Sequence, residues 1–263
     1  MKKIILCVVL FTALTSCKKS NDKLQTEIAV PKIENEWIHI FDGVTTEGWR
    51  AYNGDSLPPG WIVKDSVLTF DTALGLEQDY SGGKDIIYGR EEFDNFELYL
   101  EWRIPKGGNS GIFYHLKEGI PDLGPPDIAP EYQLIDDENY AAVHDLTAYN
   151  KSMGVSKNVQ NLQDWQKTAA DYAMHPADES QKILHPVGQW NSTRIIFTPE
   201  KVEHWLNGKK VVSFVPWSED WIAKKNAGKW KDANLYGSFK TGYIGLQDHS
   251  SPIWFRNIKI KKL

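Results

Sequence analysis

Glutamate and glutamine alternate with apolar residues in the segment Pro130–Asp137. If this segment is a β-strand, Glu131 and Gln133 lie on one face and Tyr132 and Leu134 on the other, because strand side chains alternate between faces. A carboxylate on a sheet face can move protons as a general acid or base, and a nearby amide can bind hydroxyl groups. The pattern predicts a polar groove on the sheet. A solvent-facing edge strand is the alternative.

A glycine-rich turn leads into a second candidate strand, Gly107–His115. Alternation places Asn109, Gly111 and His115 on one face. Glycine inside a strand leaves room for another group to approach the backbone closely. Asn109 and His115 are therefore substrate-binding candidates. A β-bulge with a hydrogen-bonded core asparagine would explain the same residues without a ligand.

A third polar group occurs at a strand–turn–strand near the C-terminus. Gln247 and His249 share a face by alternation, and Arg256 lies in the apolar segment that follows. A lone histidine is more often structural than catalytic, but here glutamine, histidine and arginine lie close in sequence. We expect His249 to be a second acid/base candidate and the other two to bind hydroxyls. Asp248 also fits a turn residue that caps its own backbone.

Several well-known catalytic patterns are missing from the sequence. It contains no His-Glu-x-x-His, Walker, dinucleotide-binding, Gly-x-Ser-x-Gly or EF-hand motif. It also lacks the Glu-x-Asp-x-Glu run that laminarinase-like sandwich glycosidases place on one strand face. This argues against an ordinary retaining glycosidase with two carboxylates.

A sheet is needed to position these polar side chains, and the rest of the chain predicts one. Phe96–Ile104 alternates apolar and polar residues, as a half-buried strand does. Trp61–Phe70 has the pattern of a hairpin. Asn207-Gly208 separates two apolar runs, which is the strongest short hairpin signal because both residues tolerate positive φ. Further strands are expected at 194–198, 202–206, 211–215, 241–247 and 253–260.

Many short strands separated by Gly, Pro and Asn predict an all-β protein, a β-sandwich or jelly roll with short helices in its loops. Helix is expected at 161–174 and after Ser218, an N-cap followed by acidic residues. No composition break divides 36–263, which predicts a single domain. The proline-rich loop 117–130 and the long excursion 145–188 are expected to wall a binding site.

Composition narrows the class of protein. Hydrophobic residues make up 41% of the 263, so the chain can bury a core. A net charge of −5 argues against binding to nucleic acid. The 11 Trp and 11 Tyr fit either an aromatic sandwich core or a sugar-stacking surface, and Trp102 is included as a substrate-binding candidate.

The N-terminus has the pattern of an export signal. Two lysines precede the apolar run 4–14, which is too short to span a bilayer. The run ends at Leu14–Cys17, which resembles a bacterial lipoprotein signal. We expect a signal peptide over 1–16, lipidation at Cys17 and a flexible tether over 17–35. An ordinary secretory signal cut elsewhere is the alternative.

These features predict a lipoprotein of the cell envelope, facing the periplasm or exposed on the outer membrane. Cys17 and Cys7 are the two cysteines of the chain. Removal of the signal and acylation of Cys17 would leave no free thiol, which excludes cysteine catalysis. The membrane would be contacted only through the lipid anchor.

Ordered segments across almost the whole expected mature chain resemble the 3-keto-disaccharide hydrolase family, which was long described as a domain of unknown function. Its members are frequent among exported lipoproteins of gut and soil Bacteroidetes. Three of the segments are Gly108-Asn-Ser-Gly-Ile112, Glu131-Tyr-Gln-Leu-Ile-Asp136 and Gly245-Leu-Gln-Asp-His249. The others lie at 37–49, 188–191, 206–208 and 255–258. The family often has glutamate where this chain has Gln189, so Gln189 cannot serve as a carboxylate here.

The resemblance implies a concanavalin-like jelly-roll β-sandwich with a concave ligand-binding sheet. It also implies cleavage of an oligosaccharide or glycoside substrate that is oxidised at C3 of the sugar. A base would remove the acidified C2 proton, the C1 group would leave, and water would add back. We expect Glu131 and His249 to be the acid/base residues. The expected substrate-binding residues are Asn109, His115, Gln133, Gln247, Arg256 and Trp102.

Two questions stay open at this stage. The first is a divalent metal ion, which Glu131, His115 or His249 could hold because oxygen and imidazole ligands suit several such ions. No other cofactor is expected. The second is whether the chain is an enzyme at all, since a carbohydrate-binding surface lipoprotein or a surface scaffold would fit much of the same sequence.

Overall fold

The computed structural model describes residues 36–263, and the signal peptide, Cys17 and the tether expected at the N-terminus lie outside them. The described residues fall within one compact unit. No helix among them is long and apolar enough to cross a membrane.

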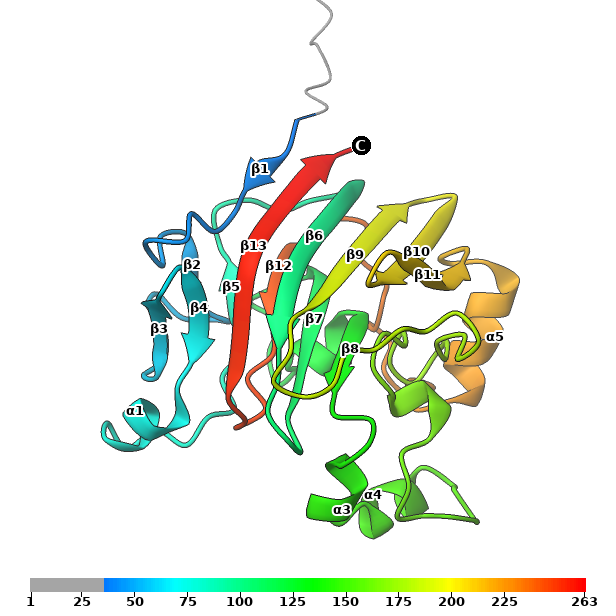
Figure 1. The fold of residues 1–263 in the computed structure, drawn as a ribbon. Helices are drawn as coiled ribbons and strands as arrows, with labels where there is room; N and C mark the ends of the chain where they lie inside the picture. Colours follow the sequence, from blue (N-terminus) through cyan, green and yellow to red (C-terminus); the bar gives the residue numbers. More distant parts are fainter. Residues whose placement is uncertain (1–35) are drawn as a thin grey trace, which may run out of the picture. The chain divides into compact units, whose positions relative to one another are not determined.

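Two antiparallel sheets form the fold, as the alternation predicts (Figure 1). The larger sheet runs in the order β11-β10-β9-β6-β13-β4-β3, with β1 also paired to β13. Its strands are β1 (Ile38–His39), β3 (Trp61–Lys64), β4 (Val67–Phe70), β6 (Phe96–Arg103), β9 (Asn191–Thr198), β10 (Lys201–Leu206), β11 (Lys209–Phe214) and β13 (Ile253–Lys262).

The smaller sheet lies behind the larger one in Figure 1 and runs in the order β2-β5-β12-β7-β8. Its strands are β2 (Trp49–Ala51), β5 (Ile86–Tyr88), β7 (Asn109–Leu116), β8 (Glu131–Ile135) and β12 (Tyr243–Leu246). The concanavalin-like sandwich expected from the sequence is confirmed.

The core lies between the sheets and is built by strict alternation. Along β6, Phe96, Leu98, Leu100 and Trp102 are fully buried and the residues between them are partly exposed. The smaller sheet contributes buried side chains to the same apolar cluster from β7 and β8, namely Ile112, Tyr114, Tyr132 and Leu134. The other face of the smaller sheet, which points away from the core, is called the outer face below.

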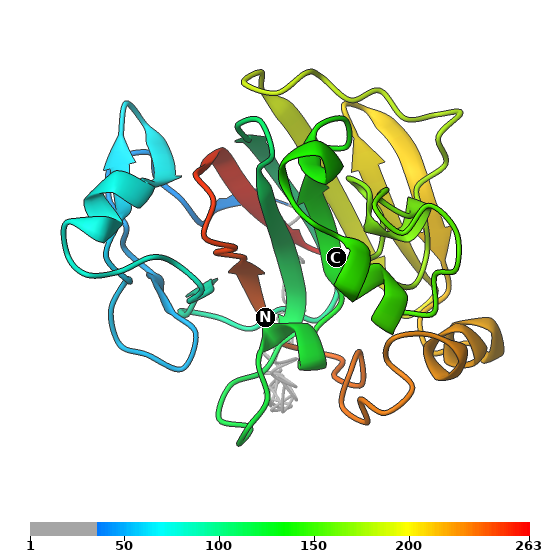
Figure 2. The same cartoon turned by 90° about the horizontal axis from the view of Figure 1, so that it is seen from below.

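Helices are short and lie in the connections, as expected. They are α1 (Thr72–Leu76), α2 (Pro125–Ile128), α3 (Tyr140–Val143), α4 (Thr147–Ser152), the 3-10 helix η1 (Asp164–Gln166) and α5 (Glu219–Ala227). Figures 1 and 2 show α3 and α4 together at one end of the sandwich and α5 beyond the β10–β11 side. The helix expected at 161–174 is wrong, since only the turn η1 forms there.

Local signals explain the turns and caps. Asn207 and Gly208 both have positive φ, at 46° and 78°, in the tight turn between β10 and β11. Asp65 and Ser66 do the same between β3 and β4, at 52° and 61°. Ser218 caps α5, because its side-chain oxygen accepts from the Trp221 N–H.

The excursion at 145–188 protects the open side of β8. The Ala169 and Tyr172 N–H groups donate to the carbonyls of Gln133 and Glu131, and the Gln133 N–H donates to the carbonyl of Ala170. β8 is therefore paired on both sides although it ends the sheet. Glu131 and Gln133 are each only 4% exposed, so the alternative of a solvent-facing edge strand is wrong.

Candidate functional site

Glu131 reaches across the outer face onto the neighbouring strand β7. In the β7–β8 register, Gly111 pairs with Gln133 and Phe113 pairs with Glu131. A β carbon at Gly111 would lie 2.7 Å from the carboxyl carbon of Glu131 and 2.8 Å from its Cγ, and closer still to Oε1. Glycine in this strand therefore makes room for the carboxyl group, as the sequence suggested for an approaching group.

The Glu131 carboxyl group is buried and incompletely satisfied. Its Oε1 has no hydrogen-bond partner among the described residues. Burial raises the pKa of Glu131 to about 8; the nearby Lys229 ammonium works against this rise, whereas Asp85 and Asp171 add to it. A carboxyl group that ionises near neutral pH can act as a general base or acid.

Two further predicted residues face the same way with free acceptor atoms. Asn109 Oδ1 and Gln247 Oε1 are buried without a hydrogen-bond partner in the described part of the chain. The Gln247 N–H donates to the Gly111 carbonyl at 2.9 Å, which places Gln247 beside Gly111. Buried polar atoms are rarely left unpaired in folded proteins, so an unpaired group suggests an absent ligand or water.

Gln133 also lies on the outer face, where it pairs across the sheet with Gly111. Its Oε1 accepts from the Leu134 N–H at 2.9 Å, so this oxygen is already occupied. The amide nitrogen of Gln133 is the atom that can donate to a ligand.

Asp85, which directly precedes β5, joins this face and was missed in the sequence. Ile86 packs in the core and Ile87 packs on the outer face, so alternation puts Asp85 on the outer face as well. Its Oδ1 accepts from the Asp248 N–H at 2.8 Å. Burial raises the pKa of Asp85 to about 7; the hydrogen bond from the Asp248 N–H opposes this rise, and the Asp248 carboxylate adds to it.

Lys229 is a second residue that the sequence did not reveal. Its Nζ lies 4.3 Å from the ring centre of Trp230 and 4.7 Å from that of Tyr172. The Tyr172 N–H donates to the Glu131 carbonyl, which brings this aromatic pair to the end of β8. Within residues 36–263, no carboxylate comes within ion-pair distance of the Lys229 ammonium. Its charge is available to the Glu131 carboxylate or to a ligand.

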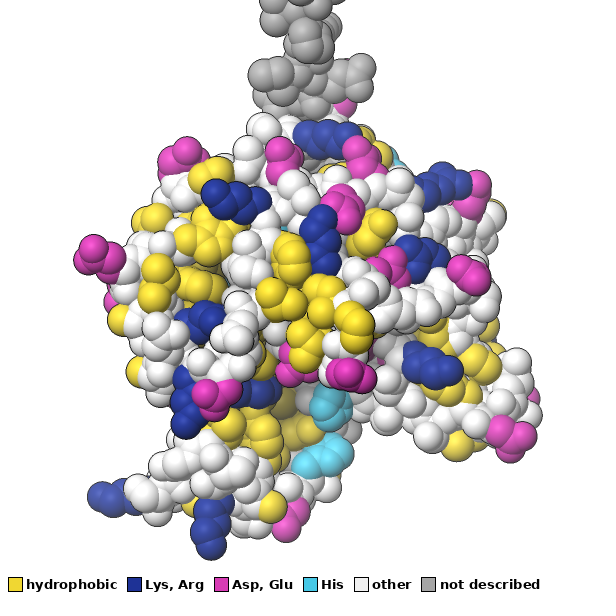
Figure 3. Space-filling view, turned by 180° about the vertical axis from the view of Figure 1, so that it is seen from behind, with side chains coloured by type: hydrophobic (Ala, Val, Ile, Leu, Met, Phe, Trp, Pro, Cys, Tyr) yellow, Lys and Arg dark blue, Asp and Glu magenta, His cyan; other side chains and the backbone are white. Residues whose placement is uncertain are grey.

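His249 lies at the end of β12 in a hollow of about 360 Å³ that Asn109 also lines. Tyr140 and His144 form another part of the wall, with their rings 4.2 Å apart. Figure 3 views the smaller-sheet side and shows histidine side chains beside a recess. His249 keeps exposed surface, but its surroundings lower its pKa, chiefly through loss of solvent.

Both expected walls are present around the outer face. α2, from the 117–130 loop, packs Ile128 against Phe113 and Leu116. The segment 169–172, from the long excursion, pairs with β8. Glu131 itself is not among the residues that line the hollow at His249.

His115 does not share the outer face with Asn109. It has a positive φ of 55° at an irregularity in the β7–β12 pairing, which turns its side chain over. The ring lies 4.2 Å from the Phe197 ring, and its Nε2 bonds to the Asp94 carbonyl at 2.7 Å. The bulge that the sequence left open therefore occurs, but at His115.

Arg256 and Trp102 belong to the larger sheet and do not reach the outer face. Arg256 pairs with Glu101 at 2.7 Å and stacks over Trp190 at 4.0 Å. Trp102 is 0% exposed, and its Nε1 donates to Thr193. Neither of these two substrate-binding candidates therefore lies on the outer face, because each side chain follows the alternation of its own strand.

The three residues considered as metal ligands are not brought together, since His115 faces away from Glu131. Across residues 36–263, no three His, Cys, Asp or Glu side chains are grouped so as to hold a metal ion. The outer face instead combines the buried Glu131 carboxyl group, the half-buried Asp85 carboxyl group, one ammonium and several amides.

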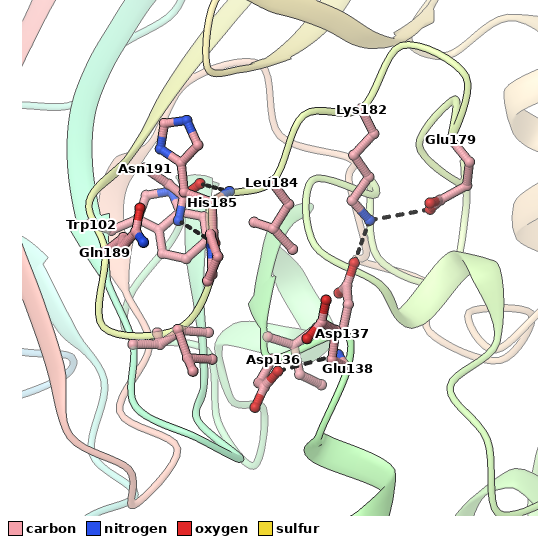
Figure 4. Close-up of a pocket in the computed structure, with 14 residues that line it drawn as sticks. Trp102, Asp136, Asp137, Glu138, Glu179, Lys182, Leu184, His185, Gln189 and Asn191 are labelled. Carbon is pink, nitrogen blue, oxygen red and sulfur yellow. Dashed lines mark hydrogen bonds and ion pairs between the residues drawn. The ribbon is translucent and has the colours of Figure 1, made fainter.

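A separate cavity of about 260 Å³ lies between the ends of β6, β8 and β9 (Figure 4). Asp137 holds Lys182 at 2.5 Å, and Asn191 Oδ1 accepts from the His185 N–H at 2.9 Å. Gln189 also lines this cavity. Lys182 and Asp137 thus pair with each other, as do His185 and Asn191.

The chain is similar in sequence to proteins of one known family. Residues 36–261 match the model of the 3-keto-alpha-glucoside-1,2-lyase-like domain. A 3-keto-disaccharide hydrolase of Bacteroides thetaiotaomicron is 34% identical over 254 residues, which cover 90% of this chain and 81% of that protein.

Two solved structures of candidate glycosyl hydrolases from Parabacteroides distasonis are also similar. One is 37% identical with a TM-score of 0.72, over 86% of this chain and 94% of that one. The other is 26% identical with a TM-score of 0.60, over 87% of this chain and 100% of that one.

Proposed function

This chain belongs to the 3-keto-alpha-glucoside-1,2-lyase-like family, and from that premise we propose that it cleaves 3-keto-glycosides by removing the C2 proton and expelling the C1 group. It is an enzyme related to a 3-keto-disaccharide hydrolase and to glycosyl hydrolases. The observation that carries the mechanism is the buried Glu131 carboxyl group, which lies over Gly111 with Oε1 unpaired.

Glu131 acts as the base. A ketone at C3 makes the C2 proton acidic, because the resulting negative charge spreads onto the ketone oxygen as an enolate. The base must be ionised when it takes the proton, and Glu131, whose pKa burial raises to about 8, reaches that form increasingly as the pH rises toward 8. Lys229 provides positive charge beside this carboxylate and can stabilise the enolate oxygen.

The amide side chains hold the sugar. Asn109 Oδ1 and Gln247 Oε1 accept hydrogen bonds from sugar hydroxyls, which satisfies two buried acceptors that lack partners. The Gln133 amide nitrogen donates to the same ring. His249, in the hollow that it shares with Asn109, contacts the departing part of the glycoside.

The decisive experiment compares oxidised and plain substrates. The enzyme is incubated in D₂O with a 3-keto-glucoside and with the matching glucoside, each with and without a chelator. We expect cleavage of the 3-keto-glucoside alone, with deuterium at C2 of the product. Rapid hydrolysis of the plain glucoside with C2 hydrogen retained would reject the mechanism. Binding of both without cleavage would favour the carbohydrate-binding alternative.

We also propose that the enzyme is a cell-envelope lipoprotein acylated at Cys17. The support is the sequence Leu14–Cys17 after a short apolar run. An anchor of this kind would hold the sandwich near the membrane, with residues 18–35 as the intervening chain.

A further inference from the structure

Four residues align in a row across the outer face: Asp85, which directly precedes β5, Gln247, which directly follows β12, Gly111 of β7 and Gln133 of β8. Leu246 pairs with Ile86 on one side and with Ile112 on the other. The next position along β12, Gln247, therefore stands between Asp85 and Gly111. Hydrogen bonds support this register, since the Gln247 N–H donates to Gly111 and the Asp248 N–H donates to Asp85.

The row places the carboxyl groups of Asp85 and Glu131 on the same face of the smaller sheet, with Gln247 between their strands. Strands are about 4.8 Å apart, so the Asp85 and Gly111 backbones are separated by roughly 10 Å. The Glu131 carboxyl group lies over Gly111. The Gln247 side chain lies in the row between them.

We propose that Asp85 is the proton donor to the leaving C1 oxygen, opposite Glu131, which takes the C2 proton. This assignment rests on the proposed function and adds to it a second catalytic residue.

The charges around the two carboxyl groups favour these roles. Lys229 lies near Glu131 and favours its ionised form. The Asp248 carboxylate accepts from Tyr80 at 2.6 Å and from the Ser250 N–H at 3.0 Å. That negative charge beside Asp85 favours its protonated form. Because burial raises the pKa of Glu131 to about 8 and that of Asp85 to about 7, the reactive form, with Glu131 ionised and Asp85 protonated, is the less populated one, and these two neighbouring charges favour it.

His249 is less suited to the donor role. The surroundings of His249 lower its pKa, so the imidazole is mostly neutral at pH 7 and holds no acidic proton of suitable strength. Asp85 is the more deeply enclosed group, and burial raises its pKa to about 7.

The steps balance with these two residues. The Glu131 carboxylate accepts the C2 proton, and the electron pair of the C–H bond moves to the C3 ketone as an enolate. The enolate then forms the C1–C2 double bond while the C1–O bond breaks, and the departing oxygen takes the Asp85 proton. Water next adds to C1 and gives one proton to Asp85, while Glu131, whose proton exchanges with solvent at this stage, protonates C2. Both residues regain their starting states.

The test uses two 3-keto-glucosides that differ in the leaving group. A methyl glucoside needs a proton on its departing oxygen, whereas a 4-nitrophenyl glucoside leaves as a stable anion. We expect Asp85→Asn to lower kcat for the methyl substrate by about 10²–10⁴-fold and for the nitrophenyl substrate by less than tenfold. C2 exchange with D₂O should persist. The asparagine carbonyl can still accept from the Asp248 N–H, so the fold should survive.

Two matched controls sharpen the result. Asp79→Asn makes the same charge change at an exposed residue of the same region and should leave kcat unchanged for both substrates. His249→Ala should not discriminate between the leaving groups. If Asp85→Asn does not fold, Asp85→Ser serves in its place and should show the same discrimination.

Equal losses on both substrates, or no loss, would overturn the role of Asp85. The same conclusion follows if His249→Ala alone discriminates between the leaving groups. A failure of the proposed function itself gives a different result from a failure of the Asp85 assignment. In that case the unmodified enzyme would incorporate no solvent hydrogen at C2.

Discussion

Glu131 and Gly111 form a matched pair across two neighbouring strands, in which the carboxyl group of one occupies the space that a side chain on the other would fill. Because β7 and β8 are paired at this point, neither backbone can move away without breaking sheet hydrogen bonds. The glycine therefore determines where the carboxyl group lies. This relationship links a sequence signal, glycine in mid-strand, to the position of the proposed base.

Gly111→Ala tests this relationship directly. The new methyl group would meet the Glu131 carboxyl group at well under van der Waals distance, so the carboxyl group must swing away. We expect kcat and the rate of C2 exchange to fall by at least tenfold, with a smaller change in KM. Gly124→Ala is the control, since a β carbon there meets only ordinary contacts at 3.7 Å and beyond. Unchanged C2 exchange in Gly111→Ala would contradict the positioning role.

Glu131→Gln removes the base while keeping the shape of the side chain. A neutral amide cannot accept the C2 proton, so turnover of a 3-keto-glucoside should fall by roughly 10²–10⁴-fold. C2 exchange should fall with it, whereas binding of the substrate should persist in a direct titration. Near-normal turnover by this variant would exclude Glu131 as the base.

The same substitution should stabilise the fold, and more so at high pH. Glu131 keeps its proton up to about pH 8 in the folded state and loses it near its ordinary pKa of 4.5 when unfolded. Between these values the folded state binds more protons, so the free energy of unfolding falls as pH rises. Glu131→Gln removes that loss.

The gain in unfolding free energy should be near zero at pH 4.5 and reach on the order of 3–5 kcal/mol at pH 8 and above. Urea unfolding of both proteins at pH 5 and pH 9 measures it. A gain that is the same at both pH values would show that Glu131 ionises normally in the folded state.

Alternation and turn chemistry predicted most of the fold. The period-two pattern of Phe96–Ile104 and the turn at Asn207-Gly208 depend on neighbouring residues only, and both formed as expected. The same alternation placed Glu131 and Gln133 correctly. It failed at His115, because one residue with positive φ reverses the facing of a strand and no neighbouring residue signals it.

The parts of the site that come from distant segments could not be predicted. Lys229 follows α5 and reaches Glu131 only through the packing of Trp230 and Tyr172. Asp85 could have been found, since it directly precedes a buried apolar pair and follows a glycine turn, as a strand-end residue does. Which other strand it would face depends on the sheet order, which alternation does not give.

Cys17→Ser tests the expected lipid anchor. Serine cannot form the thioether that holds the lipid, so the variant should appear in the soluble fraction or remain as the uncleaved precursor. Fractionation followed by mass measurement of the N-terminal peptide distinguishes these outcomes. Normal membrane retention of the variant would argue for another mode of attachment, and Cys7→Ser is the matched control because Cys7 lies within the expected signal.

Lys229→Gln should shift the pH dependence of the reaction. The ammonium lowers the pKa of Glu131, and removing it lets burial and the neighbouring Asp85 and Asp171 raise that pKa further. The rate of C2 exchange rises with pH as the base ionises, so its midpoint should move upward by up to about one pH unit. The plateau should also fall if the ammonium stabilises the enolate. Lys231→Gln, an exposed lysine two residues away, is the control and should leave the midpoint unchanged. A Lys229→Gln profile that overlays the unmodified enzyme would show that this cation acts on neither Glu131 nor the substrate.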